Sequence, residues 1–235
     1  MALPFFYISN YDSTQKQIVL DEDTSKHVVQ VLRMKVGEQL NLTDGKGNLM
    51  SCSITYDHKK HCTVEVKDTR HMAQGTRRVS IAISLLKNTN RFEWFLEKAT
   101  EIGVSEIIPL ICERTEKEKF RFDRMHGIVI SAMLQSQQVW LPALHEPVQF
   151  HKAIKVSSAE QKFIAHCDGG NKQSIFQFPD SQVQNSLIFI GPEGDFTLAE
   201  IELALQNNFI PASLGETRLR SETAGVVAAT LLCQV

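Results

Sequence analysis

The chain has 235 residues, of which 43% are hydrophobic and 22% charged, and its formal net charge at pH 7 is −2. These values are ordinary for a globular protein of one large or two modest domains, and they exclude bulk, non-specific nucleic-acid binding. The sequence has no apolar run of membrane-spanning length, and its first residues lack the features of a signal peptide. Five scattered cysteines and eight histidines show no ligand spacing, so we expect no metal, no disulfide framework and a cytoplasmic location.

The first third of the chain is predicted to form a compact β-barrel. Residues 39–43 alternate polar and apolar side chains, residues 44–48 contain two glycines typical of a turn, and residues 49–54 return as a second strand. Another strand is expected at residues 62–66. Residues 1–78 carry 11 Lys or Arg and 9 Asp or Glu, a small excess that favours an anionic partner for this part.

One helix is predicted to interrupt these strands. Ser25 is its candidate N-cap, because a hydroxyl can accept a hydrogen bond from the first free backbone N–H groups of a helix. Its buried side is expected to consist of Val28, Val29, Val31 and Leu32. A polar segment at residues 70–78 follows the last strand and is interpreted as a linker.

From Val79 onward the pattern changes to strands that alternate with helices. Gly103 follows a helical pattern and is a candidate C-cap, while Thr197 and Glu200 have the spacing of a capping box. Such alternation predicts an α/β domain with a mostly parallel sheet covered on both faces. Strands are expected at residues 79–86, 107–111, 163–167, 187–190 and 212–214, and helices at residues 91–102, 122–138, 197–207 and 221–233.

Two glycine-bearing loops follow strands near the end of the chain, at residues 191–195 and 214–224. Glycine lets the backbone approach a ligand closely, and α/β proteins bind ligands at the carboxyl ends of parallel strands. Neither loop has the sequence of a Walker A or dinucleotide-binding loop. Taken alone, the first loop is better explained as a strand-to-helix turn that Pro192 stiffens. The second loop leads into Ser221, a candidate helix cap, and also into Arg220 and Glu222, which a purely structural helix start does not need. The pair indicates a site for a nucleotide-like cofactor.

Several segments in the same order resemble the ribosomal RNA small subunit methyltransferase E family, which belongs to the SPOUT methyltransferases. The resemblance covers the whole chain. It implies a PUA-like β-barrel that binds RNA at residues 1–72, and a SPOUT methyltransferase domain with a C-terminal trefoil knot at residues 73–235. The segments that carry it are Gly191–Gly194, Leu214–Gly215, Leu219–Ala224, His27–Glu38, Lys98–Val104 and Glu113–Thr115.

The resemblance implies an enzyme that methylates N3 of a uridine in 16S ribosomal RNA, with S-adenosylmethionine as cofactor and the small ribosomal subunit as partner. SPOUT enzymes pair their knotted domains, and the final helix is almost wholly apolar, so a homodimer is expected. The cofactor residues implied are His166, Cys167, Gly191, Pro192, Glu193, Gly194, Leu214, Gly215, Leu219, Arg220, Ser221, Thr223 and Ala224.

For the reaction, Arg220 is expected to stabilise a developing uracil anion, and Glu222 to orient it or take its proton. The alternative for this pair is a salt bridge across the loop. Contacts to RNA are expected from Arg33, Lys35, Lys87, Arg91 and Arg114.

The family usually has a glycine at the position of Asp195 and an arginine near the N-terminus, which this sequence lacks. An inactive RNA-binding assembly factor therefore stays open as an alternative. A SPOUT enzyme acting on another RNA is a second alternative, against which the match over the whole chain argues.

Overall fold

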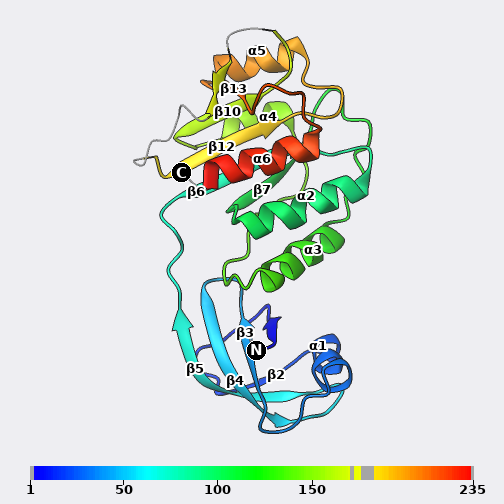
Figure 1. Cartoon of the computed structure of the whole chain (residues 1–235), viewed down its shortest axis with the longest axis vertical. Helices are drawn as coiled ribbons and strands as arrows, with labels where there is room; N and C mark the ends of the chain where they lie inside the picture. The colour runs from blue at the N-terminus through cyan, green and yellow to red at the C-terminus, as the bar shows by residue number, and fades with distance from the viewer. Residues whose placement is uncertain (1–2, 170–171, 176–182, 234–235) are drawn as a thin grey trace. The chain divides into compact units, whose positions relative to one another are not determined.

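The computed structural model describes residues 3–169, 172–175 and 183–233. The chain forms two compact units (Figure 1). Unit 1 consists of Met1–Gln74 together with Met133–Leu141, and unit 2 consists of Gly75–Ala132 and Pro142–Val235. The segment Met133–Leu141 thus belongs to the N-terminal unit, although it lies well beyond the linker in the sequence. The domain division predicted between residues 72 and 73 does not include this segment in the N-terminal domain.

Unit 1 is built on a five-stranded sheet in the order β1-β3-β4-β5-β2. The predicted hairpin is confirmed, with Leu40 opposite Cys52 and Leu42 opposite Met50. These four side chains are fully buried or nearly so, because alternate residues of a strand point to the same face. The strands are β1 (Phe5–Tyr7), β2 (Gln17–Val19), β3 (Gln39–Thr43), β4 (Asn48–Tyr56) and β5 (Thr63–His71).

The helix of unit 1 differs from the prediction. Helix α1 (Glu22–Lys26) is capped by Asp21, whose side chain accepts from Thr24 N, and it continues into a π-helical turn, η1 (His27–Val31). Ser25 instead lies inside the helix, where its Oγ donates to Leu20 O and accepts from Cys62 N. Val28 is buried as expected, but Val31 and Leu32 are exposed, because the wider π turn rotates them off the buried face.

Unit 2 contains an eight-stranded sheet, in the order β11-β13-β10-β12-β6-β7-β8 with β9 beside β7, and all its pairs are parallel. The predicted strands are confirmed to within a few residues, whereas three short ones were not predicted: β8 (Ala143–Leu144), β9 (Val148–Gln149) and β11 (Gln173–Ser174). The others are β6 (Arg78–Ser84), β7 (Glu106–Ile111), β10 (Gln161–Ala165), β12 (Asn185–Ile190) and β13 (Ile210–Ser213).

Helices cover the sheet of unit 2. Gly103 ends α2 in the left-handed conformation, and α5 begins with the predicted capping box. Helices α2 and α6 pack against each other, and α6 also packs on β6 (Figure 1). Helix α4 contacts α5 and β7, and an apolar cluster there includes Phe150 and Phe189. The helices are α2 (Thr89–Ile102), α3 (Phe122–Gln135), α4 (Phe150–Val156), α5 (Leu198–Gln206) and α6 (Ser221–Cys233).

The C-terminal path positions the candidate site. Strand β13 lies next to β10, but α6, which follows it, packs against β6 and α2. The intervening loop therefore crosses the ends of β10 and β12, which agrees with the knotted C-terminus that the resemblance implies. At Gly225 the helix comes so close to α2 that a Cβ would lie 2.6 Å from Phe95 Cε2. The parallel sheet and the N-terminal β-unit confirm the predicted fold class.

Candidate functional site

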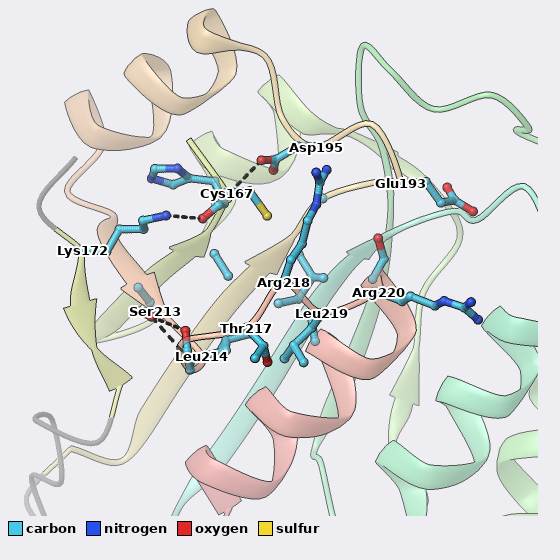
Figure 2. A pocket seen from close by; sticks show the side chains of 18 of the residues that line it. Cys167, Lys172, Glu193, Asp195, Ser213, Leu214, Thr217, Arg218, Leu219 and Arg220 are labelled. Atoms are coloured by element: carbon cyan, nitrogen blue, oxygen red, sulfur yellow. Dashed lines mark hydrogen bonds between the residues drawn. The ribbon is translucent and has the colours of Figure 1, made fainter. Parts of the chain in front are cut away.

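A cavity of about 640 Å³ opens at the carboxyl ends of the strands of unit 2. Its walls come from the loops after β10, β12 and β13 and from the first turn of α6 (Figure 2). The loops expected from the sequence therefore converge on one place. The predicted cofactor residues that line the cavity are His166, Cys167, Gly191, Pro192, Glu193, Leu214, Gly215, Leu219, Arg220, Ser221 and Ala224.

Two predicted residues, Gly194 and Thr223, are not among those that line the cavity. A Cβ at Gly194 would lie 3.4 Å from Arg114 Cδ. The missing side chain thus makes room for the arginine. Arg114 Nη1 donates to Gly194 O at 2.7 Å, so this side chain holds the loop after β12 in place.

Asp195 takes over the role of a glycine in this loop. Its φ is 65°, in the left-handed region that glycine favours and that Asp tolerates better than most residues. Its carboxylate then accepts from Cys167 N at 2.7 Å and from Phe196 N at 2.8 Å. The departure from the family pattern therefore ties the loop after β12 to the loop after β10, and both loops line the cavity.

The loop after β10 brings a histidine and a lysine together. Lys172 Nζ donates to His166 O at 3.0 Å. Burial, and secondarily the nearby Lys172 charge, lowers the pKa of His166, so the imidazole is neutral near pH 7. Its Nδ1 is buried and has no hydrogen-bond partner in the part of the chain that the structure describes.

The second glycine loop runs along the opposite wall. Gly215 has a φ of 141°, which favours glycine. Ser213 Oγ accepts a hydrogen bond from the Gly215 N–H and donates one to the Gly215 C=O. Figure 2 shows Arg218 reaching across the cavity toward Asp195 and Arg220 extending in another direction. Arg218 is exposed; the sequence places it in the second glycine loop, two residues before Arg220, but predicts no role for its side chain.

The start of α6 contains a buried carboxylate. Glu222 is 6% exposed, and its Oε1 lies 3.6 Å from Arg91 Nε on α2. Its Oε2 has no hydrogen-bond partner among the described residues. The sequence pairs Glu222 with Arg220, but the ion pair in the structure is with Arg91, which lines the cavity.

The predicted RNA-binding residues fall into two groups. Lys87, Arg91 and Arg114 lie in unit 2; the Lys87 N–H donates to Glu193 Oε1 on the cavity wall, and its Nζ pairs with Glu116 at 2.7 Å. This pairing raises the pKa of Lys87. Arg33 and Lys35 lie in unit 1, where Arg33 is exposed with a φ of 59° and Lys35 Nζ is 3.5 Å from an Asp57 carboxylate oxygen.

A second cavity, of about 660 Å³, opens at the amino ends of the same strands. Its floor is apolar and includes Leu187 and Phe189 of β12. On its rim Glu106 accepts from Ser80 Oγ, and its Oε1 lies 2.7 Å from His145 Nε2. Sequence reasoning did not predict this cavity, because its residues come from short segments without a recognisable motif.

The described residues contain no group of three or more His, Cys, Asp or Glu arranged to hold a metal. Within the same ranges, no helix has the length and apolar character needed to cross a membrane.

Comparisons with known proteins match both units. A profile of RNA methyltransferase domains matches residues 73–233, and one of RNA methyltransferase PUA domains matches residues 20–67. The ribosomal RNA small subunit methyltransferase E of Rickettsia conorii is 28% identical over 225 residues, which cover 94% of this chain and 91% of that protein.

Solved structures agree with these matches. A probable rRNA-methyltransferase from Porphyromonas gingivalis is 37% identical with a TM-score of 0.89, covering 97% of this chain and 95% of its own. A ribosomal RNA small subunit methyltransferase E from Neisseria gonorrhoeae, solved bound to S-adenosyl methionine, is 26% identical with a TM-score of 0.86 and the same coverage.

Proposed function

Because the chain belongs to the ribosomal RNA small subunit methyltransferase E family, we propose that it is an enzyme that methylates 16S ribosomal RNA with S-adenosylmethionine, at N3 of a uridine. The observation that carries this proposal is the convergence of three loops on one cavity at the carboxyl ends of the parallel strands. This is the edge of an α/β sheet at which ligands bind.

The residues of the cavity fit S-adenosylmethionine. Its volume of about 640 Å³ lies in the range of small-molecule sites. The buried His166 Nδ1 offers an unused polar atom, and we expect backbone groups of the loops after β12 and β13, which line the cavity, to meet the adenine ring. Gly191 packs against Phe196, which keeps the first loop close to the sheet. When bound, the cofactor supplies an activated methyl group on a sulfonium, so the protein has mainly to bind and orient.

The acceptor side is assigned to the start of α6. Methylation at N3 of uracil requires that the N3 proton leave to solvent, and the ring then carries negative charge until N3 takes the methyl group. Arg220 lines the cavity, and no carboxylate of a described residue lies within ion-pair distance of it. Its guanidinium is therefore available to stabilise that charge. Glu222 is buried behind the cavity wall, which supports the orienting role over direct proton transfer.

Membership of the same family supports proposals for the roles of the domains, the partner and the location of the protein. We propose residues 1–72 as the RNA-binding domain and residues 73–235 as the catalytic domain, the small ribosomal subunit as partner, and the cytoplasm as location. Arg33, Lys35, Lys87, Arg91 and Arg114 stay candidate RNA contacts.

We also propose a homodimer, because α6 is almost wholly apolar and some of its apolar side chains, Val226, Val227 and Leu231, are only partly buried within one chain. Light scattering at micromolar concentration should give twice the chain mass; a monomer would exclude the dimer.

An inactive RNA-binding factor is the main alternative. It rested on Asp195 and on the missing N-terminal arginine. Of these two, Asp195 adopts the conformation of a glycine and holds two of the cavity loops together. This observation favours a working cofactor site. Incubation of the purified protein with S-adenosylmethionine and unmodified small subunits, followed by mass mapping of 16S RNA, tests the proposal. One N3-methylated uridine is expected; transfer to a ribose oxygen or to no position would overturn it.

A further inference from the structure

Glu222 and Arg91 form an ion pair that the proposed function does not yet use. The two residues are 131 positions apart, on the packed helices α6 and α2. The side chain of Glu222 is 8% exposed and that of Arg91 is 38% exposed. A buried carboxylate is costly unless it is paired and hydrogen-bonded, yet one oxygen of Glu222 has no partner among the described residues. Such an arrangement suggests a role in the site more than in stability.

The geometry separates the tasks of the two residues. Arg91 lines the cavity, whereas Glu222 does not, and Glu222 Oε2 has almost no exposed surface. A group inside the cavity therefore meets the guanidinium and not the carboxylate. The ion pair engages Arg91 through Nε, and no hydrogen bond from its terminal nitrogens to a described residue occupies them. The terminal nitrogens are available as donors toward the cavity.

We propose that Arg91 donates hydrogen bonds to a carbonyl oxygen of the target uracil, and that Glu222 is the positioning residue that fixes its guanidinium. This inference rests on the proposed function. When N3 has lost its proton, the negative charge is shared with the two carbonyl oxygens that flank N3. A guanidinium is a planar, permanently charged donor that suits such oxygens. Arg220 and Arg91 line the same cavity, which provides one cation for each carbonyl.

The same arrangement predicts base specificity. Cytosine carries an amino group where uracil has its second carbonyl, and N3 of cytosine has no proton to lose. A guanidinium that faces an amino group leaves two donors opposed and unpaired, which is strongly unfavourable in a site shielded from water. The arginines thus select uridine over cytidine without contacting N3.

The test is a double-mutant cycle with Arg91→Met, Glu222→Gln and both together, assayed by single-turnover methylation of small subunits. Arg91→Met should lower the rate by about 10²–10³-fold, as expected when a donor to a developing charge is lost. The methylation rate of Arg91→Met should keep increasing with pH up to a higher pH than the rate of the wild type does, because the arginine no longer assists loss of the N3 proton. Arg91→Lys, which keeps the charge without the fork, should recover part of the rate.

Glu222→Gln should lower the rate less than Arg91→Met, and the double variant should be no slower than Arg91→Met, because Glu222 acts through Arg91. Arg124→Met is the matched control: Arg124 pairs with Glu93, which is also on α2, at 2.6 Å, but neither lines the cavity. It should methylate at the wild-type rate. Circular dichroism checks that each variant is folded.

Two rate measurements would overturn the inference: a normal methylation rate for Arg91→Met, or a further loss of rate when Glu222→Gln is added to Arg91→Met. Two binding measurements on Arg91→Met would also overturn it. The third outcome is weaker S-adenosylmethionine binding in calorimetry than in the wild type, and the fourth is a smaller salt dependence of RNA binding. The third would assign Arg91 to the cofactor and the fourth to an RNA phosphate. If the wild type itself fails to methylate uridine N3, the proposed function falls instead.

Discussion

The carboxyl-end and amino-end cavities of unit 2 have nearly equal volumes and lie at opposite ends of one parallel sheet, and β12 contributes residues to both. At the carboxyl ends, glycine loops expose backbone groups and α6 begins, so its free N–H groups favour negative charge. At the amino ends α4 terminates, and Glu106 is hydrogen-bonded to both Ser80 and His145. Volume therefore does not distinguish the two cavities; the direction of strands and helices does.

The largest expected effect is a difference in methylation rate between variants of an arginine in each cavity. Arg220→Ala should lower the methylation rate by about 10²–10³-fold while S-adenosylmethionine binding stays intact, because charge stabilisation in the transition state affects turnover and not ground-state binding. Arg78 lines the amino-end cavity and gives the matched control, Arg78→Ala, which should keep the wild-type rate. Equal rates for both variants would remove Arg220 from the reaction.

The next effect concerns the helix that forms a wall of the carboxyl-end cavity. In Gly225→Ala the new Cβ would lie 2.6 Å from Phe95 and 3.1 Å from Ile83. Overpacking of this kind typically costs about 1–3 kcal/mol in the free energy of unfolding. Gly127→Ala in α3 meets no atom within 4 Å and should stabilise by up to about 1 kcal/mol, since alanine favours helices. Urea unfolding of the two variants measures the difference, and equal stabilities would contradict the packing.

A smaller effect is expected from residues that line neither cavity. Arg33→Ala with Lys35→Ala should weaken RNA binding and reduce the slope of log affinity against log salt by about 0.7 per lost contact to single-stranded RNA. S-adenosylmethionine affinity should not change. Filter binding over a salt series checks the slope; parallel loss of both affinities would indicate misfolding instead of lost phosphate contacts.

The smallest effect is a pH dependence. The pKa of His166 is lowered, chiefly by burial, so below pH 6.5 the unfolded chain binds more protons at this position than the folded one. Its contribution to stability is therefore complete above pH 6.5 and lost as the pH falls toward the lowered pKa. His166→Asn should reduce this decline of thermal stability at low pH. The control variant His145→Asn, in the other cavity, should still show the part of the decline that comes from His166. An unchanged decline in His166→Asn would exclude it as the source.

The parts of the fold that local signals govern could be predicted. Gly103 and the Thr197–Glu200 capping box act within one helical turn, so the ends of α2 and α5 are confirmed. The Ser25 cap is wrong because Asp21, four residues earlier, offers a better acceptor and the sequence does not reveal which of two polar residues the tertiary structure selects. Strands β8 and β9 are two residues long, and their pairing with β7 depends on neighbours that no local pattern specifies.

The candidate site divides in the same way. Glycine loops after predicted strands could be located from sequence, and most of their residues line the cavity. The direction of each side chain could not: Gly194 faces Arg114, and Glu222 pairs with Arg91 across two helices. These contacts join residues 80 and 131 positions apart, so they arise from packing alone. Asp195 replaces a glycine without loss of the loop, which only its backbone conformation reveals.

The central claim is that S-adenosylmethionine binds at the carboxyl ends of the strands. Calorimetry with the wild type, Cys167→Trp and Ser158→Trp tests it most directly, because both positions are exposed and each lines one of the two cavities. A tryptophan at position 167 should fill the carboxyl-end cavity and abolish the binding heat, while Ser158→Trp should bind like the wild type. Normal binding by Cys167→Trp, with binding lost in Ser158→Trp, would contradict the account.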